Sequence, residues 1–241
     1  MIEALALTRR YGGRVAVREL SFAVRPGEVV GLLGPNGAGK TTTLRMLAGV
    51  LRPSSGTARI SGHDIVAEAL AAKRRLAFVP DEPRFFDYLT VEEHQRFVAR
   101  VHGVRDVEPH LQHLAEHTTV GARLAAFPSE LSRGMRQELA LACALVHEPV
   151  ALLLDEPLTG LDPIAIRRTK NVVRAAAARG TCILLSSHLL HLVAELCERI
   201  VLLREGQSVA QGTIADLARD RALEGRPLEE LFVSLLTDKA P

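Results

Sequence analysis

The residues best suited to chemistry lie in a glycine-rich segment that fits the pattern G-x-x-x-x-G-K-[ST]. Glycines let the backbone curl so that successive N–H groups point at phosphate oxygens, and a helix that starts near the lysine adds the positive end of its dipole. Lys40 is expected to hold the β- and γ-phosphates of a nucleoside triphosphate, and Thr41 to give its hydroxyl to Mg²⁺. The residues predicted to bind the nucleotide here are Gly34, Pro35, Asn36, Gly37, Ala38, Gly39, Lys40, Thr41 and Thr42.

Two adjacent carboxylates follow a later apolar run. Asp155 comes directly after Val150 to Leu154, at the end of a predicted strand, where a second protein ligand for phosphate-bound Mg²⁺ is needed. Glu156 is then placed to orient or deprotonate the water that attacks the γ-phosphate in line. Adjacent acids at a strand end are often plain solvated turn residues, but the phosphate-binding segment favours the catalytic interpretation.

The elements around the glycine-rich segment supply the context that its chemistry requires, a strand before it and a helix after it. The strands predicted before it are residues 2–7, 20–24 and 29–33. Apolar residues from Leu44 to Leu51 recur at helical spacing, and the turn from Pro53 to Gly56 is expected to end that helix. An ordinary glycine-rich turn is the alternative interpretation, and this context disfavours it.

Strands and helices alternate along most of the remaining chain. Between about Tyr88 and His147, helical sequence rich in histidine and alanine replaces the β-type signal. Residues 58–79 predict a strand, a turn, a short helix and a second strand. The later predicted elements are strands at 150–154 and 181–185, helices at 163–179, 189–196 and 228–236, and a hairpin at 200–211. The two later strands are continuously apolar, as expected of parallel strands buried on both faces.

This pattern predicts an α/β fold of the P-loop NTPase class, with a mostly parallel sheet, antiparallel β segments at the N-terminus and an inserted helical subdomain. The ligand site of such a fold lies beyond the carboxyl ends of the strands. We expect a single domain over residues 1–241, with the inserted subdomain at about 84–148 and a C-terminal helical tail at about 213–241. The amphipathic helix of the tail is expected to dock on its own domain rather than on a partner.

Composition and charge favour no macromolecular partner. The 241 residues include 30 basic and 28 acidic side chains mixed along the chain, so their formal net charge of +2 directs no strong field at nucleic acid or anionic lipid. The three cysteines, Cys143, Cys182 and Cys197, have apolar neighbours and predict reduced packing residues. No apolar run reaches the roughly 20 residues that span a membrane, and Met1 opens without a signal peptide, so we expect a cytosolic chain.

The segment from Leu131 to Gln137 resembles the signature Leu-Ser-Gly-Gly-Gln of the ATP-binding cassette (ABC) ATPases, and the resemblance extends over nearly the whole chain. Ser132 is a good helix N-cap, and Gly134 permits close approach at the start of a helix, so the segment forms a second anion site. The resemblance implies that Ser132 and Gly134 bind the γ-phosphate held by the opposite subunit. Without the other motifs, a helix cap would be the preferred interpretation.

Two departures from that signature define a subtype. Arg133 replaces a glycine, and Met135 replaces the glutamine. Gly-Met-Arg-Gln variants of this kind occur in ABC exporter subunits, so the resemblance implies an exporter-like member. These two replacements are expected to affect the rate of hydrolysis and the way in which the signature contacts the phosphate.

Four weaker features complete the resemblance. Gly160-Leu161-Asp162 resembles the loop that crosses the ABC dimer interface, although Asp162 alone is a good helix N-cap. His188 follows a strand, as the family's switch histidine does, and its ring would touch the γ-phosphate; a lone histidine there is more often structural. Tyr11 stands where the family stacks an aromatic ring on adenine, and turn packing is the alternative. Asp81 replaces the glutamine of the loop that touches Mg²⁺, which makes it a further candidate metal ligand or else a plain turn residue.

The resemblance implies an ATP-hydrolysing subunit in which Glu156 and His188 are catalytic and Mg²⁺ is the cofactor. Two copies, or a copy and a homologue, would close around two ATP molecules and energise transport, export rather than import, through a separate transmembrane permease at the cytoplasmic face of the membrane. No nucleic acid is expected. The alternative is a soluble ABC ATPase acting on a ribosome, nucleic acid or signalling partner, whose tandem cassettes, coiled coils or zinc modules this sequence lacks. A P-loop GTPase or kinase is disfavoured because no Asn-Lys-x-Asp guanine-binding motif is present.

Overall fold

Two β-sheets of different kinds organise the protein, in a computed structural model that describes residues 1–237 and only the backbone at 191 and 192. The antiparallel sheet has the order β2-β1-β4-β5, formed by β1 (Ile2–Tyr11), β2 (Arg14–Val24), β4 (Ser55–Ile60) and β5 (His63–Asp64). The larger sheet has the order β10-β9-β3-β8-β7-β6, formed by β3 (Val29–Leu33), β6 (Leu76–Val79), β7 (Ala151–Asp155), β8 (Cys182–Ser187), β9 (Arg199–Arg204) and β10 (Gln207–Thr213). Its strands run parallel except where β10 pairs with β9. The predicted fold class is confirmed.

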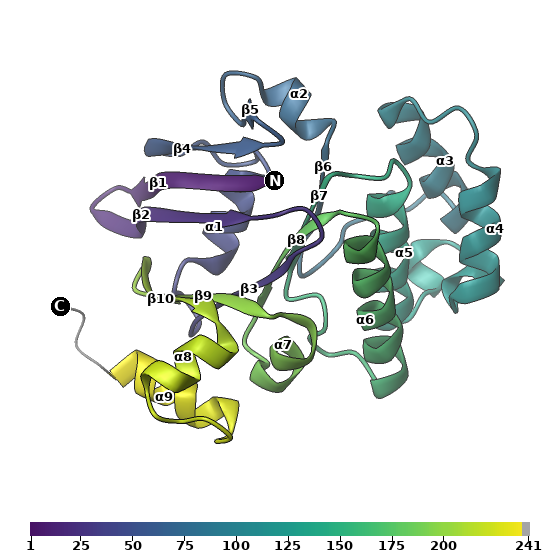
Figure 1. Cartoon of the computed structure of the whole chain (residues 1–241). Helices are drawn as coiled ribbons and strands as arrows, with labels where there is room; N and C mark the ends of the chain where they lie inside the picture. Colours follow the sequence, from purple (N-terminus) through teal and green to yellow (C-terminus); the bar gives the residue numbers. More distant parts are fainter. Residues whose placement is uncertain (238–241) are drawn as a thin grey trace.

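Helices surround these sheets, and α3 and α4 lie on the side of the molecule away from α8 and α9 (Figure 1). The α-helices are α1 (Lys40–Leu47), α2 (Ala69–Lys73), α3 (Val91–His102), α4 (Glu108–His117), α5 (Arg133–Leu145), α6 (Pro163–Ala178), α7 (Leu190–Leu196), α8 (Ile214–Asp220) and α9 (Leu228–Thr237). The elements between β6 and β7 are therefore helical. Of the predicted C-terminal tail, residues 238–241 lie outside the described residues. The subdomain division at about 84–148 stays a prediction.

The strands that carry the candidate site are buried on both faces. Leu153 of β7 packs in the core that also contains residues of the antiparallel sheet and α1, whereas its neighbours Leu152 and Leu154 pack in the core beneath α6, α7 and α9. Successive side chains of a strand point to opposite faces, which explains why the sequence is continuously apolar here. Full burial of a leucine contributes roughly 1.5–3 kcal/mol, so the end of β7 is held firmly.

The structure corrects two predicted boundaries. The strands predicted at 2–7 and 20–24 are the ends of one long hairpin that turns at Gly12 and Gly13, and register shifts in β1 break the alternation on which the prediction depended. The helix predicted to continue to Leu51 ends at Leu47, because Gly49 takes the left-handed conformation at φ 63°. Both errors arise from local backbone geometry rather than from the hydrophobic pattern.

Two stacked histidines join the ends of α3 and α5. The rings of His102 and His147 have centroids 3.6 Å apart at an interplanar angle of 19°. Burial, followed by the neighbouring His102, lowers the pKa of His147 to about 4. His147 is therefore neutral in the folded protein at pH values where the unfolded chain binds a proton.

This pKa predicts a loss of stability in mild acid. Because the folded pKa lies below the unfolded value of about 6.5, the contribution of His147 is complete above that pH and is lost as the pH falls toward 4. After allowance for partial exposure, we expect about 1–2 kcal/mol of this pH dependence to disappear in His147→Phe, which keeps a ring for stacking. Denaturant unfolding from pH 7 to pH 4 tests this, with the exposed His117→Phe as control. If the free energy of unfolding depends on pH equally in wild type and in His147→Phe, the prediction is wrong.

Candidate nucleotide site

A tight loop joins β3 to α1 and has the shape that the glycine-rich sequence predicts. A Cβ atom at Gly34, where φ is 149°, would lie 2.4 Å from the Leu203 carbonyl oxygen, and one at Gly39, where φ is 107°, would lie 2.6 Å from that of Ala16. These approaches admit only glycine. The Ala38 amide donates to the Pro35 carbonyl at 3.1 Å and closes the turn. The loop is thus held from both sides by neighbouring backbone.

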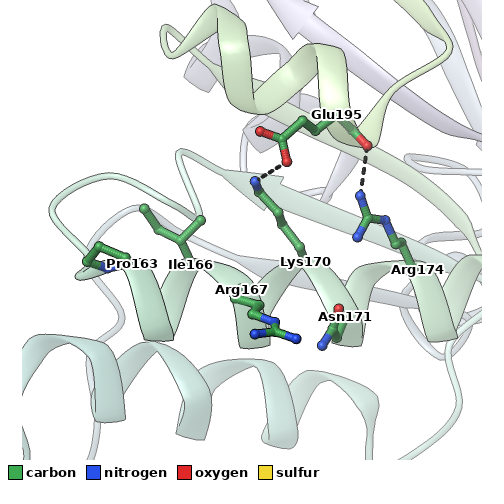
Figure 2. A pocket seen from close by; sticks show the side chains of 7 residues that line it. All are labelled: Pro163, Ile166, Arg167, Lys170, Asn171, Arg174 and Glu195. Carbon is green, nitrogen blue, oxygen red and sulfur yellow. Dashed lines mark hydrogen bonds and ion pairs between the residues drawn. The ribbon is translucent and has the colours of Figure 1, made fainter.

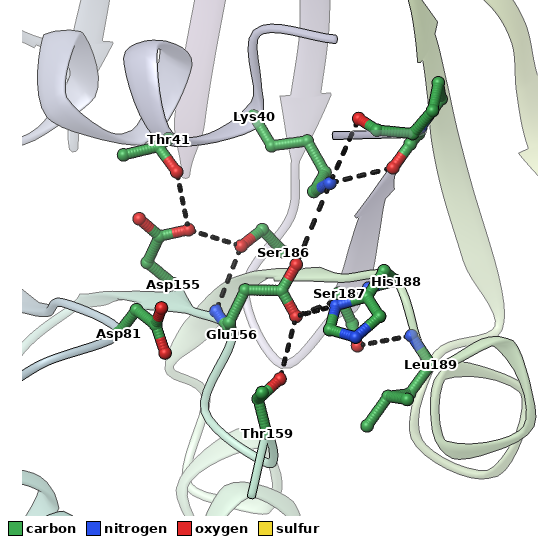
Figure 3. Close-up of polar contacts among 12 residues, drawn as sticks. Lys40, Thr41, Asp81, Asp155, Glu156, Thr159, Ser186, Ser187, His188 and Leu189 are labelled. Carbon is green, nitrogen blue, oxygen red and sulfur yellow. Dashed lines mark hydrogen bonds and ion pairs between the residues drawn. The ribbon is translucent and has the colours of Figure 1, made fainter. Parts of the chain in front are cut away.

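Lys40 fills the inside of this loop (Figure 3). Its Nζ atom lies 2.7 Å from the Gly34 carbonyl oxygen and 3.4 Å from that of Pro35, and 3.7 Å from Glu156 Oε1. The side chain is only 7% exposed. A buried ammonium group is costly unless anionic or strongly polar partners surround it, so this position favours binding of a phosphate anion beside it.

Thr41 and Asp155 form the place where a divalent cation fits. The Thr41 hydroxyl donates to Asp155 Oδ1 at 3.2 Å, and the Ser186 hydroxyl donates to the same atom at 2.6 Å. The carboxylate is 3% exposed and forms no salt bridge with any residue that the structure describes. A buried anion without a cationic partner, next to a hydroxyl, has the oxygen chemistry that Mg²⁺ prefers.

The geometry also limits how Mg²⁺ would be held. Among the described residues, no group of three or more His, Cys, Asp or Glu side chains is arranged to hold a metal. Thr41 and Asp155 would therefore supply few protein ligands, and phosphate oxygens and water would supply the rest. This is the usual arrangement for Mg²⁺ bound together with a nucleotide.

Glu156 is held by several donors on one of its two oxygens. Its Oε2 atom accepts from Thr159 Oγ1 at 3.1 Å and from the His188 amide at 3.3 Å, and it lies 2.9 Å from His188 Nδ1. Its backbone φ is 49°, and its amide donates to Ser186 Oγ at 3.1 Å. A non-glycine residue at positive φ costs free energy and is often found at functional sites. Oε1, which faces Lys40, remains on the side of the phosphate loop (Figure 3).

The signature segment has a firm local structure. The Ser132 hydroxyl caps α5 by accepting from the Met135 amide at 3.2 Å. A Cβ atom at Gly134 would lie 3.3 Å from Ala165 Cβ, so the glycine also allows α5 and α6 to approach. Ser132 is exposed, and no hydrogen bond or ion pair of the described residues joins it to Lys40. The roles of Ser132 and Gly134 in nucleotide binding therefore stay predictions that require a second subunit.

Each of the other two predicted residues has an arginine partner. Asp81 lies near Asp155 and Glu156 (Figure 3), and its Oδ1 atom is 3.6 Å from Arg133 Nη2. Tyr11 ends β1, is half exposed, and has the Arg9 guanidinium carbon 4.6 Å from its ring centre. Burial raises the pKa of Asp81 above its ordinary value. Metal binding by Asp81 and adenine stacking on Tyr11 both stay predictions.

Sequence reasoning missed residues that support the predicted ones. Ser186 contacts both Asp155 and Glu156, and Thr159 contacts Glu156. Arg14, opposite Tyr11 in the hairpin, stands near the loop, since a Cβ atom at Gly37 would lie 3.9 Å from its Nη2. Ser186 directly follows the strand predicted at 181–185, but its contact with Asp155 depends on the register of two strands and has no signal in the sequence. Thr159 offered no signal either.

A hollow of about 520 Å³ lies apart from this site on α6 and α7 (Figure 2). Lys170 lies 2.6 Å from Glu195 Oε2, and Arg174 donates to the Glu195 carbonyl at 3.0 Å. Lys170 and Arg174 of α6 are thus both joined to Glu195 of α7, so the hollow is part of the packing contact between these two helices.

The loop around Lys40, the buried carboxylate of Asp155 and the parallel sheet that positions them define a P-loop nucleotide-binding domain. The chain matches the family model described as ABC transporter over residues 17–159. It is 36% identical to the probable multidrug ABC transporter ATP-binding protein YbhF of Escherichia coli (strain K12), over 99% of this chain and 42% of that protein. It is 41% identical to the Nod factor export ATP-binding protein I of Paraburkholderia xenovorans (strain LB400), over 88% of this chain and 70% of that protein.

A solved structure described as that of the ATP binding subunit of an ABC transporter is similar over nearly the whole chain. The TM-score is 0.93 at 34% identity, and the match covers 98% of this chain and 100% of that one. The chain therefore belongs to the family of ABC transporter ATP-binding proteins. It spans less than half the length of YbhF, although it spans 70% of the Nod factor export protein.

Proposed function

We propose that this protein binds and hydrolyses ATP with Mg²⁺ and thereby energises transport, in the direction of export, through a separate transmembrane permease. The observation that carries the proposal is the assembly of four side chains around one loop. Lys40 Nζ lies 3.7 Å from Glu156 Oε1, and Thr41 Oγ1 lies 3.2 Å from Asp155 Oδ1. Burial of an ammonium group at the start of α1 beside carboxylates at the end of β7 is costly, and such charged groups cluster at functional sites.

Each residue of the site has a distinct role in the proposed reaction. Lys40 would bind the β- and γ-phosphates, and Thr41 and Asp155 would hold Mg²⁺, which neutralises charge on the phosphates when bound. Glu156 would orient the attacking water and accept its proton through Oε1. Thr159 and His188 contact the other oxygen, Oε2, so Oε1 faces the loop. His188 would hold Glu156 in that orientation, and its ring, 45% exposed, would be accessible to the γ-phosphate.

The proposed active state contains two subunits. Ser132 caps a helix at an exposed position, so its hydroxyl can still donate, together with the backbone N–H groups of the first turn of α5, to a phosphate held by another copy or a homologue. ATP would then add contacts that exist only in the closed dimer, and hydrolysis would remove them. This is how nucleotide turnover would drive a conformational cycle.

The relatives support a membrane partner. Those named above are a probable multidrug ABC transporter ATP-binding protein and a Nod factor export ATP-binding protein, which supports transport and its outward direction. No helix among the described residues is long and apolar enough to cross a bilayer. We place the working protein at the cytoplasmic face of the membrane. A soluble ABC ATPase that acts on a ribosome, nucleic acid or signalling protein is the alternative.

Two measurements test the proposal. Purified protein should release phosphate from ATP only when Mg²⁺ is present, and protein extracted in mild detergent from its own cells should copurify with a polytopic membrane protein. Turnover without a membrane partner, together with copurification of ribosomes, would favour the alternative. Absence of both ATP binding and phosphate release would remove the proposed function.

An exposed aromatic group beside the loop after β6 is the surface we assign to the permease. Phe86, Tyr88 and Phe97 stand together, with Phe86 5.8 Å from Tyr88 and 5.3 Å from Phe97 between ring centres, and Tyr88 is 74% exposed. Exposed aromatic clusters are typical of protein interfaces, where such residues contribute most of the binding energy. The group follows Asp81 closely in the chain, so a partner bound there would contact the segment that faces the nucleotide site.

This assignment predicts loss of the partner. The double variant Tyr88→Ala and Phe97→Ala should weaken copurification of the permease by about tenfold or more, since each truncated interface aromatic typically costs about 1–2 kcal/mol. Val233→Ala, which removes an exposed apolar side chain from α9, is the control and should have no effect. Retention of the permease by the double variant at the wild-type level would show that the surface lies elsewhere.

A further inference from the structure

Arg133 connects three segments that meet at the start of α5. Its Nη2 atom lies 3.6 Å from Asp81 Oδ1, in the loop after β6. Its guanidinium also covers Gly160, in the loop after β7, where a Cβ atom would lie 2.9 Å from the guanidinium carbon. The first turn of α5 is therefore joined by one side chain to the loops that follow two neighbouring strands of the sheet.

Asp81 lies in the electrostatic field of the site. Its carboxylate lies near those of Asp155 and Glu156 (Figure 3), and it is also paired with the Arg133 guanidinium. An ionised Asp81 is thus stabilised by a cation on one side and destabilised by the two site carboxylates on the other. A divalent cation placed between Asp81 and Asp155 would reverse the second effect.

We propose that Arg133 is a positioning residue that holds Asp81 in the absence of metal and releases it when Mg²⁺ and ATP bind. The inference rests on the proposed function, because it requires a metal nucleotide at Thr41 and Asp155. Arg133 and Mg²⁺ compete for one carboxylate, so occupation of the site frees the first turn of α5 from the loop after β6. The metal site and the signature helix are in this way linked inside one subunit.

The strength of the ion pair suits such an exchange. The side chains of Arg133 and Asp81 are 51% and 47% exposed, and exposed pairs of this kind are weak and easily replaced. The planar guanidinium reaches the carboxylate while lying over Gly160, which the rounder ammonium of a lysine would do less well. Two of the departures from the family pattern, the acid Asp81 in the loop after β6 and Arg133 at the start of α5, then have one common explanation.

The test is a double-mutant cycle on metal binding rather than on hydrolysis. Binding of a non-hydrolysable ATP analogue is measured as Mg²⁺ is raised from a chelated baseline, and the Mg²⁺ concentration at half effect is recorded. Arg133→Gln removes the competing cation and should lower that concentration about two- to fivefold, the range an exposed pair allows. In protein that already carries Asp81→Asn, the same change should have no effect. Arg133→Lys, which retains the charge, should stay closer to wild type.

The control is Arg167→Gln on α6, which removes an exposed positive charge outside the nucleotide site. Hydrogen exchange of nucleotide-free protein provides a second readout, since either Arg133→Gln or Asp81→Asn should speed exchange at residues 81–87 and 133–137, and the double variant should add nothing. If Arg133→Gln shifts the Mg²⁺ dependence equally with and without Asp81, or does not shift it at all, the inference is wrong. The proposed function then still holds, provided that the wild-type protein binds ATP. Loss of metal-dependent ATP binding in wild type would instead remove the proposed function itself.

Discussion

Glu156→Gln is expected to retain ATP and lose its hydrolysis. Glutamine keeps the size and the acceptor that Thr159 and His188 approach, but its amide cannot accept a proton from the attacking water. General-base catalysis by a positioned side chain typically contributes about 10²–10⁴-fold, so phosphate release should fall by that factor. The measurement is a phosphate-release assay beside an equilibrium titration of ATP.

The same variant should also change the oligomeric state. If ATP supplies contacts that exist only between two subunits, a protein that cannot remove the γ-phosphate should accumulate as a dimer with ATP and Mg²⁺, seen by light scattering. Glu198→Gln, at an exposed position outside the site, is the matched control and should remain like wild type. Wild-type turnover by Glu156→Gln would show that another group activates the water.

The position of Asp155 could be predicted because pattern and chemistry agree there. A continuously apolar run indicates a strand buried on both faces, and the first charged residue after it must emerge at the carboxyl end of the sheet. The structure places Asp155 at that end, 3% exposed, opposite Ser186 in the ladder with β8. The contact with Ser186 could not be predicted, because it depends on the register of two strands that lie far apart in the sequence.

Arg133 and Asp81 show a different limit of the sequence. Each could be recognised as a departure from the family pattern, but the two are separated by a long helical segment, so no local rule brings them together. Tyr11 shows a third limit, because register shifts in β1 break the alternation of side chains, and the strand predicted at 2–7 therefore stopped short of Tyr11. Periodicity predicts which elements exist, whereas loop paths and irregular pairing decide which side chains meet.

Lys40→Ala is expected to weaken ATP binding by about 10- to 100-fold, the equivalent of one charge-assisted hydrogen bond to phosphate. The lysine is almost fully buried, and its ammonium is the cation that lies 3.7 Å from Glu156 and 2.7 Å from the Gly34 carbonyl. Without it, a phosphate would be placed beside the Glu156 carboxylate with no ammonium group between them, so repulsion adds to the lost attraction.

The titration of Lys40→Ala must separate lost binding from lost folding. Thermal unfolding without nucleotide reports the second, and Lys73→Ala, which removes a lysine at the end of α2, is the control for the loss of one charge. Wild type should gain thermal stability on addition of ATP, as ligand linkage requires, and Lys40→Ala should gain much less at the same ATP concentration. The Lys40 ammonium group contacts loop carbonyl oxygens in this structure, so it must move toward the phosphates when ATP binds. Unchanged ATP affinity in Lys40→Ala would mean that this movement does not occur.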